Sequence, residues 1–168
     1  MSAIRKAPWQ VGLAVGATFV ASSGYLVAAL GHFFYTADGD LEAARIAEVA
    51  HIDGGHAKTM ADVALFDNHI AQVFSLVGVV LLILGIFLWN GAYRPGVRLI
   101  LTITLAVSFF GGLIPLMLSL DQASGMSAAQ VAQGEIEQLV ALIAVSLLWF
   151  GAGRRWVALD TTSSWEQN

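Results

Sequence analysis

Four long apolar stretches constrain this chain more than any other feature of its sequence. They cover roughly residues 11–34, 70–89, 97–120 and 135–150. A helix needs about 20 apolar residues to cross the ~30 Å hydrocarbon core of a bilayer. The composition agrees, because only 12% of the residues are charged, against about 25% in soluble domains. We therefore predict an all-α protein, a four-helix transmembrane bundle that forms one integral membrane domain over residues 1–168.

The first apolar stretch follows a basic pair, Arg5 and Lys6, as the core of a signal peptide would. However, it extends from Val11 to about Tyr35, and the apolar core of a signal peptide has only ~7–15 residues. We interpret this stretch as a retained transmembrane span. The lipid bilayer is then the first predicted partner.

The distribution of basic residues predicts the orientation. Six of the eight lie on one side of a four-span arrangement, and the other two, Arg45 and Lys58, lie on the opposite side. All five tryptophans lie at or beyond the same ends as the six. Lysine and arginine concentrate in cytoplasmic loops, and tryptophan marks membrane interfaces. We expect both termini, including the tail 151–168, in the cytoplasm, and residues 36–68 outside the plasma (inner) membrane.

Residues 36–68 form the one long polar connection between spans. Good helix formers from Asp40 to Ile52 predict a short amphipathic helix on the outer face of the bundle. Gly54 and Gly55 are expected to end it. A second helix is expected to start near His56 and to run into the second span.

All four histidines lie in or beside this outer segment, and carboxylates accompany them. Histidine with carboxylate and no sulfur favours a divalent transition metal such as zinc, copper(II) or iron, and the chain has no cysteine. Asp67 or Asp53 could accept a hydrogen bond from a ligating imidazole. The alternative is that these are solvated loop residues and polar helix ends. The candidate metal ligands are His32, Glu48, His51, Asp53, His56 and His69.

A b-type haem is a second candidate cofactor. His32 closes the first span and His69 opens the second, so the two imidazoles are expected at similar depth. Two histidines at equal depth on adjacent spans can ligate a haem. A ligand at the very end of a span, however, would leave the haem edge close to water.

Charged groups are sparse inside the predicted spans. Glu135 and Glu137 lie at the start of the fourth stretch, where the positive end of the helix dipole favours carboxylates. Without an acid or base near the middle of a span, proton relays and ion-coupled transport are disfavoured. The chain shows no phosphate-binding loop or nucleophile motif, and its scattered basic residues give no support for nucleic-acid binding.

Gly12 and Gly16 form a G-x-x-x-G pair on the first span, a pattern that lets two membrane helices approach closely. We expect this face to pack inside the chain's own bundle, and the alternative is docking of another subunit or a second copy. Three functions remain open. They are an accessory or assembly subunit of a larger membrane complex, a metal- or haem-binding redox protein, and a small membrane enzyme with a site under the outer segment.

Overall fold

The computed structural model describes residues 7–34, 40–120 and 128–158, and within these ranges the chain is helical without a strand. This confirms the predicted all-α class. The elements in chain order are α1 (Trp9–Phe33), α2 (Asp40–Ile52), α3 (Met60–Asn90), α4 (Arg94–Leu120), α5 (Ala128–Ser146), the 3-10 turn η2 (Leu147–Trp149) and α6 (Gly151–Ala158).

Three of these helices are long and apolar enough to cross a membrane. They are α1, α3 and the part of α4 from Arg94 to Gly111. A fourth crossing arises if Gly134–Trp149 and α6, which are bent by 67° at Phe150, count as one broken span. These lengths and compositions indicate a membrane protein.

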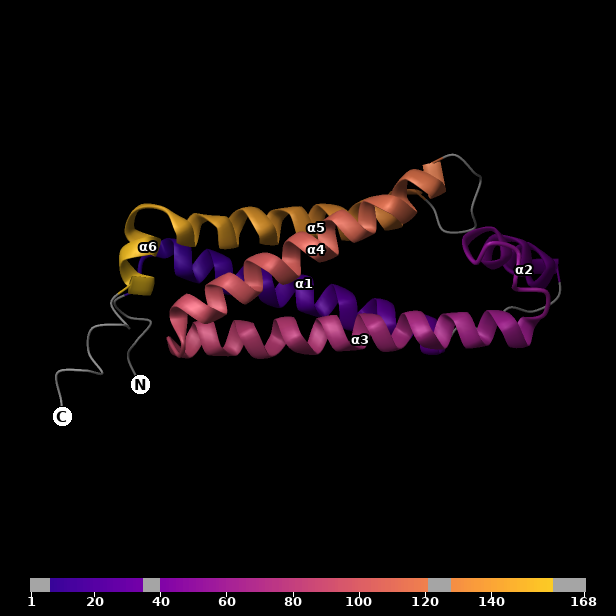
Figure 1. The fold of residues 1–168 in the computed structure, drawn as a ribbon, viewed down its shortest axis with the longest axis horizontal. Coiled ribbons are helices and arrows are strands. Elements are labelled where there is room, and N and C mark those ends of the chain that lie inside the picture. Colours follow the sequence, from indigo (N-terminus) through magenta and orange to yellow (C-terminus); the bar gives the residue numbers. More distant parts are fainter. Residues whose placement is uncertain (1–6, 35–39, 121–127, 159–168) are drawn as a thin grey trace.

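The long helices lie side by side and cluster around a shared apolar core. Helix α1 packs against α3 and α5, and α4 packs against α5 and α3. Helix α2 lies at one end of this group and α6 lies at the other (Figure 1). We refer to these as the α2 end and the α6 end.

The boundaries of α2 and α3 follow from local sequence. Gly54 and Gly55 adopt positive φ angles of 67° and 87°, which glycine reaches without steric cost, so the predicted stop after α2 is confirmed. Helix α3 begins at Met60 rather than near His56. The Thr59 hydroxyl accepts from the Asp62 amide at 3.3 Å, and the Asp62 carboxylate accepts from the Thr59 amide at 2.9 Å. This capping box satisfies two amides that would otherwise lack partners.

Helix α3 is longer than a membrane crossing requires. Its 31 residues extend ~46 Å at 1.5 Å per residue, against ~30 Å of hydrocarbon. Its length thus exceeds the thickness of the hydrocarbon, and its first turns contact α2. There Val49 of α2 and Val63 of α3 form a small buried cluster with Ala57. The expectation of one helix running from the outer segment into the second span is confirmed.

Helices α1 and α3 approach each other closely at two glycines of α3. A Cβ atom at Gly78 would lie 2.9 Å from Leu26 Cγ, and one at Gly85 would lie 2.9 Å from Phe19 Cε1. Ser22 Oγ donates to the Gly78 carbonyl at 2.8 Å across the same contact. Small residues permit this approach, and the interhelical hydrogen bond adds to it.

The Gly12 and Gly16 face does not pack inside the chain as expected. Both glycines are exposed, and a Cβ atom at either would meet nothing within 4 Å. The internal close contact uses Gly78 and Gly85 instead. The expectation of internal packing is therefore wrong, and this face of α1 points away from the other helices.

The C-terminal region was expected to be a polar tail over residues 151–168. Its first part is instead helix α6, with Trp156 6% and Val157 1% exposed against the apolar core. Gly151 starts this helix at a φ of 53°, which permits the sharp bend after η2. Residues 159–168, and the part of the predicted connector at 121–127, lie outside the described residues.

Candidate functional site

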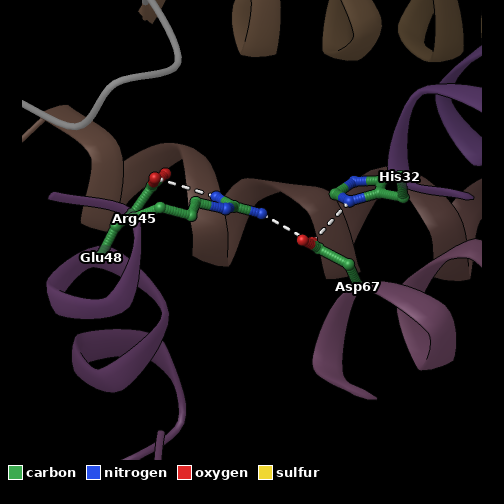
Figure 2. A network of polar contacts seen from close by, with 4 residues as sticks. All are labelled: His32, Arg45, Glu48 and Asp67. Atoms are coloured by element: carbon green, nitrogen blue, oxygen red, sulfur yellow. Dashed lines mark hydrogen bonds and ion pairs between the residues drawn. The ribbon is translucent and has the colours of Figure 1, made fainter. Parts of the chain in front are cut away.

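A polar network joins three helices at the α2 end (Figure 2). His32 Nδ1 on α1 lies 2.9 Å from Asp67 Oδ1 on α3. Arg45 Nη2 on α2 donates to the same oxygen at 2.6 Å, and Arg45 Nη1 donates to Glu48 Oε2 at 2.9 Å. Asp67 is thus the carboxylate on which a histidine and an arginine from two other helices converge.

Burial strengthens the electrostatic attraction between the side chains of this network. Asp67 is 3% exposed and Arg45 is 8% exposed. Burial opposes the charge of Arg45, but hydrogen bonds and attraction from Glu48 and Asp67 outweigh it and raise the pKa of the guanidinium above its ordinary value. Arg45 therefore stays positive at physiological pH. A charged arginine held between two carboxylates fastens α2 to α3.

The network also fixes the orientation of the His32 ring. Because a carboxylate oxygen accepts hydrogen bonds, this contact pairs it with an N–H on His32 Nδ1. The ring also meets Phe74 edge-on, with centroids 5.6 Å apart. A carboxylate that orients an imidazole is the arrangement found behind both general bases and metal-bound histidines.

A small cavity adjoins His32 and Asp67. Its volume is about 160 Å³, below the ~300–1,000 Å³ of most small-molecule sites. Its lining combines polar side chains, such as Asp67, with apolar ones, such as Val63. It is lined by His32, Phe33, Met60, Val63, Ala64, Asp67 and Asn68.

The structure brings few of the predicted metal ligands together. His51, His56 and His69 are exposed, and Asp53 is half-buried. Glu48 is engaged by Arg45. Within residues 7–34, 40–120 and 128–158, no group of three or more His, Cys, Asp or Glu could hold a metal ion. Metal binding is therefore not supported by this part of the chain.

His69 does not share the position of His32. It follows Asp67 by two residues on α3, which places it about 200° around the helix axis. Since Asp67 faces α1 and His32, His69 faces away from them, in agreement with its exposure. The His32 and His69 pair, expected as haem ligands, is therefore not assembled in this arrangement. The expected role of Asp67 as an acceptor for a histidine does match its contact with His32.

Sequence reasoning missed Arg45 as the centre of this network. A signal was available, because Arg45 is one of only two basic residues in a segment that carries seven acids. Its spacing to Glu48 also places the two side chains on one helix face. The contact to Asp67 joins residues 22 positions apart, and no local pattern reveals it.

Glu135 was expected at the start of a helix, but it lies inside one. Helix α5 begins at Ala128, so Glu135 lies about two turns inside it. It is 8% exposed, and its Oε2 has no hydrogen-bond partner among the described residues. Tyr25 of α1 lies within electrostatic range of its charge. The interpretation as helix-end electrostatics is wrong, because an acid is buried within the helix group.

A second polar cluster lies at the α6 end and pairs arginines with tryptophans. The Arg94 guanidinium carbon lies 4.1 Å from the centre of the Trp156 ring, and that of Arg98 lies 3.8 Å from Trp149. Arg94 also donates to the Trp156 carbonyl at 3.1 Å. Trp149 is in turn held by its indole N–H, which donates to Thr102 Oγ1 at 3.0 Å.

Comparison of the chain with protein-family models, with curated protein sequences and with solved structures gave no significant match.

Proposed function

We propose that this protein is an accessory or assembly subunit of a larger membrane complex, without catalysis of its own. The observation that carries the proposal is the outward face of α1. Gly12 and Gly16 are exposed there, one turn apart, and a Cβ atom at either would meet nothing within 4 Å. Two glycines at this spacing let a second membrane helix approach closely.

In this proposal the four long helices form a transmembrane bundle, and the partner is another membrane subunit or a second copy of the chain. The α6 end, with its arginines and tryptophans, faces the cytoplasm, and α2 lies outside. Reporter fusions inserted at Gly55 and at Ala92 test this orientation. They should report opposite sides of the membrane, and reports from the same side would contradict it.

The docking face is tested by comparing wild type with Gly16→Leu after purification in a mild detergent. Leucine at this position should block close approach of a partner helix, because its side chain would project outward from α1. We expect a complex of defined stoichiometry, measured by native mass spectrometry, to be lost. The melting temperature should not change, since no neighbour within the chain is displaced.

Gly31→Leu is the matched control. Gly31 also lies on α1, is exposed and has open space around a Cβ position, but it lies at the opposite end of the helix from Gly16. This variant should retain the complex. A wild-type chain that is monomeric after cross-linking in native membranes would contradict the proposal. So would a complex that survives Gly16→Leu.

The cavity beside His32 and Asp67 favours a second candidate, a small membrane enzyme or binding protein with its site at the α2 end. Here Asp67 would orient His32, and the cavity would hold a small amphiphilic ligand. Metal analysis and an absorption spectrum of the purified protein separate this candidate from the metal or haem alternative. If either reveals a bound group, His32→Gln should release it, whereas His56→Gln should not.

A further inference from the structure

The cavity at the α2 end can be entered from outside and has a buried charge in its wall. Its volume is about 160 Å³, and its lining includes Asp67, which is only 3% exposed. Two other lining residues, Phe33 and Ala64, are exposed, so the cavity opens at the surface. A cavity of ~150 Å³ holds a molecule the size of benzene. The space therefore suits a small organic molecule.

Three side chains in the lining offer hydrogen-bond acceptors. Asp67 receives both of its contacts at Oδ1, which leaves Oδ2. His32 uses Nδ1 for Asp67, and Nε2 on the opposite side of the neutral ring is then an acceptor (Figure 2). Asn68 supplies an amide oxygen. Within residues 7–34, 40–120 and 128–158, none of these three acceptors has a donor, so the cavity is prepared for a ligand that donates hydrogen bonds.

The charges around the cavity favour a cation. In the described part of the chain, the single guanidinium of Arg45 pairs with two carboxylates, those of Asp67 and Glu48. The excess of negative charge continues around the network, because residues 32–69 contain seven acids and only two basic residues. A cleft surrounded by charge of one sign attracts ligands of the opposite sign. A ligand that is both positive and a hydrogen-bond donor is therefore expected.

A primary ammonium group has both properties. It carries one positive charge and three N–H donors, which matches the three acceptors of the cavity. The other lining residues are apolar and suit a short alkyl chain; they are Phe33, Met60, Val63 and Ala64. A metal ion fits less well, because the described residues include no group of three or more His, Cys, Asp or Glu that could hold one.

We propose that this cavity binds a small primary alkylammonium ion. Asp67, His32 and Asn68 hold the ammonium group, and the alkyl chain lies against Met60 and Val63. Because His32 belongs to α1 whereas Asp67 and Asn68 belong to α3, the ligand joins these two helices. The inference rests on the second candidate function, a binding protein with its site at the α2 end, and it names the ligand. It does not depend on the docking face of α1.

NMR of the full-length protein in a detergent with an uncharged headgroup measures the binding at the site itself. The methionine methyl groups are labelled with carbon-13, and the Met60 signal, assigned with Met60→Leu, reports on the cavity that Met60 lines. The probes are butylammonium, tetramethylammonium and 1-butanol, which have equal numbers of non-hydrogen atoms. Butylammonium should shift the Met60 signal saturably and bind about tenfold more tightly than either other probe, because only it makes charge-assisted hydrogen bonds.

Ala64→Phe tests the location, because the added ring fills the cavity from its exposed edge. This variant should no longer bind butylammonium. Ala61→Phe is the matched control, since it adds the same ring to an exposed alanine of α3 that does not line the cavity, and it should bind as wild type does. Both alanines are exposed, so neither variant disturbs the core.

The possible failures can be told apart. Binding that survives Ala64→Phe would overturn the cavity as the site. Equal binding of butylammonium and tetramethylammonium would show that charge alone attracts the ligand and would overturn the three-point contact. Equal binding of all three probes that Ala64→Phe abolishes would keep a binding site at the α2 end but overturn the ammonium ion as its ligand. If no probe shifts the Met60 signal saturably, both this inference and the second candidate function are wrong.

Discussion

The two ends of the molecule hold arginine in opposite ways. At the α2 end, Arg45 is buried between Asp67 and Glu48, and its charge is neutralised within the chain. At the α6 end, Arg94 and Arg98 lie on tryptophan rings and donate to backbone carbonyls. In the first arrangement carboxylates of the same chain hold the arginine, whereas in the second aromatic rings and backbone carbonyls hold it. Ion pairs within the chain therefore fasten the α2 end, whereas the α6 end carries the exposed basic side chains of Arg154 and Arg155.

The difference has a clear energetic basis. A buried ion pair contributes little beyond its desolvation cost, but removing one partner leaves an uncompensated charge. An arginine on an aromatic face keeps part of its hydration, and the contact contributes about 0.5–2 kcal/mol. Substitutions at the two ends should consequently differ in size, and the following predictions test this from the largest effect to the smallest.

Asp67→Ala should have the largest effect. It removes the acceptor shared by His32 and Arg45 and takes away one of the two carboxylates that hold this buried guanidinium within the described part of the chain. The expected loss in the free energy of unfolding is about 3–5 kcal/mol. Hydrogen exchange should also show faster exchange in α2, because its anchor to α3 is gone.

Glu42→Ala is the control for this prediction, since Glu42 is an exposed acid on α2, the helix that Asp67 anchors. It should change stability by less than about 0.5 kcal/mol. The double variant with Arg45→Met and Asp67→Leu removes both charges and should recover most of the loss. Equal stabilities for Asp67→Ala and wild type would contradict the expected difference between the two ends.

Trp149→Leu should have an intermediate effect at the α6 end. It removes the ring under Arg98 and the hydrogen bond to Thr102, so we expect a loss of about 1–3 kcal/mol. Thermal unfolding in detergent measures it. Trp89→Leu is the control, because Trp89 is 50% exposed, and it should leave the melting temperature nearly unchanged. A loss larger than that of Asp67→Ala would show that the contacts at the α6 end, rather than those at the α2 end, contribute more to stability.

Glu48→Gln should have the smallest effect. Its side chain is 17% exposed and contacts Arg45 from the same helix, three residues away. Exposed pairs of this spacing contribute about 0.3–0.5 kcal/mol. This pair is more buried, but glutamine keeps a hydrogen-bond acceptor for Arg45, and Asp67 still holds Arg45 in the variant. Chemical denaturation should show a change below about 1 kcal/mol. A loss as large as that of Asp67→Ala would show that Glu48, rather than Asp67, anchors α2.

Sequence patterns predicted the helices better than their contacts. The bounds of α2, the glycine stop after it and the continuity of α3 from the outer segment follow from propensity, caps and hydropathy. The predicted fourth span, 135–150, matches the apolar segment Gly134–Trp149. The start of its helix was predicted too late, because α5 begins at Ala128 in a polar stretch that hydropathy does not count. That error moved Glu135 to a helix end, although it lies buried inside the helix.

The sequence by itself determined that this chain is helical, that it has helices fit to cross a membrane, and that its polar residues gather at one end. Those properties depend on hydropathy and on neighbours along the chain. Only the tertiary structure decided that Asp67 unites His32 and Arg45 and that Gly78, rather than Gly16, receives the neighbouring helix. These contacts depend on which way each helix is rotated and how it is shifted along its neighbour, and many rotations bury a comparable amount of apolar surface.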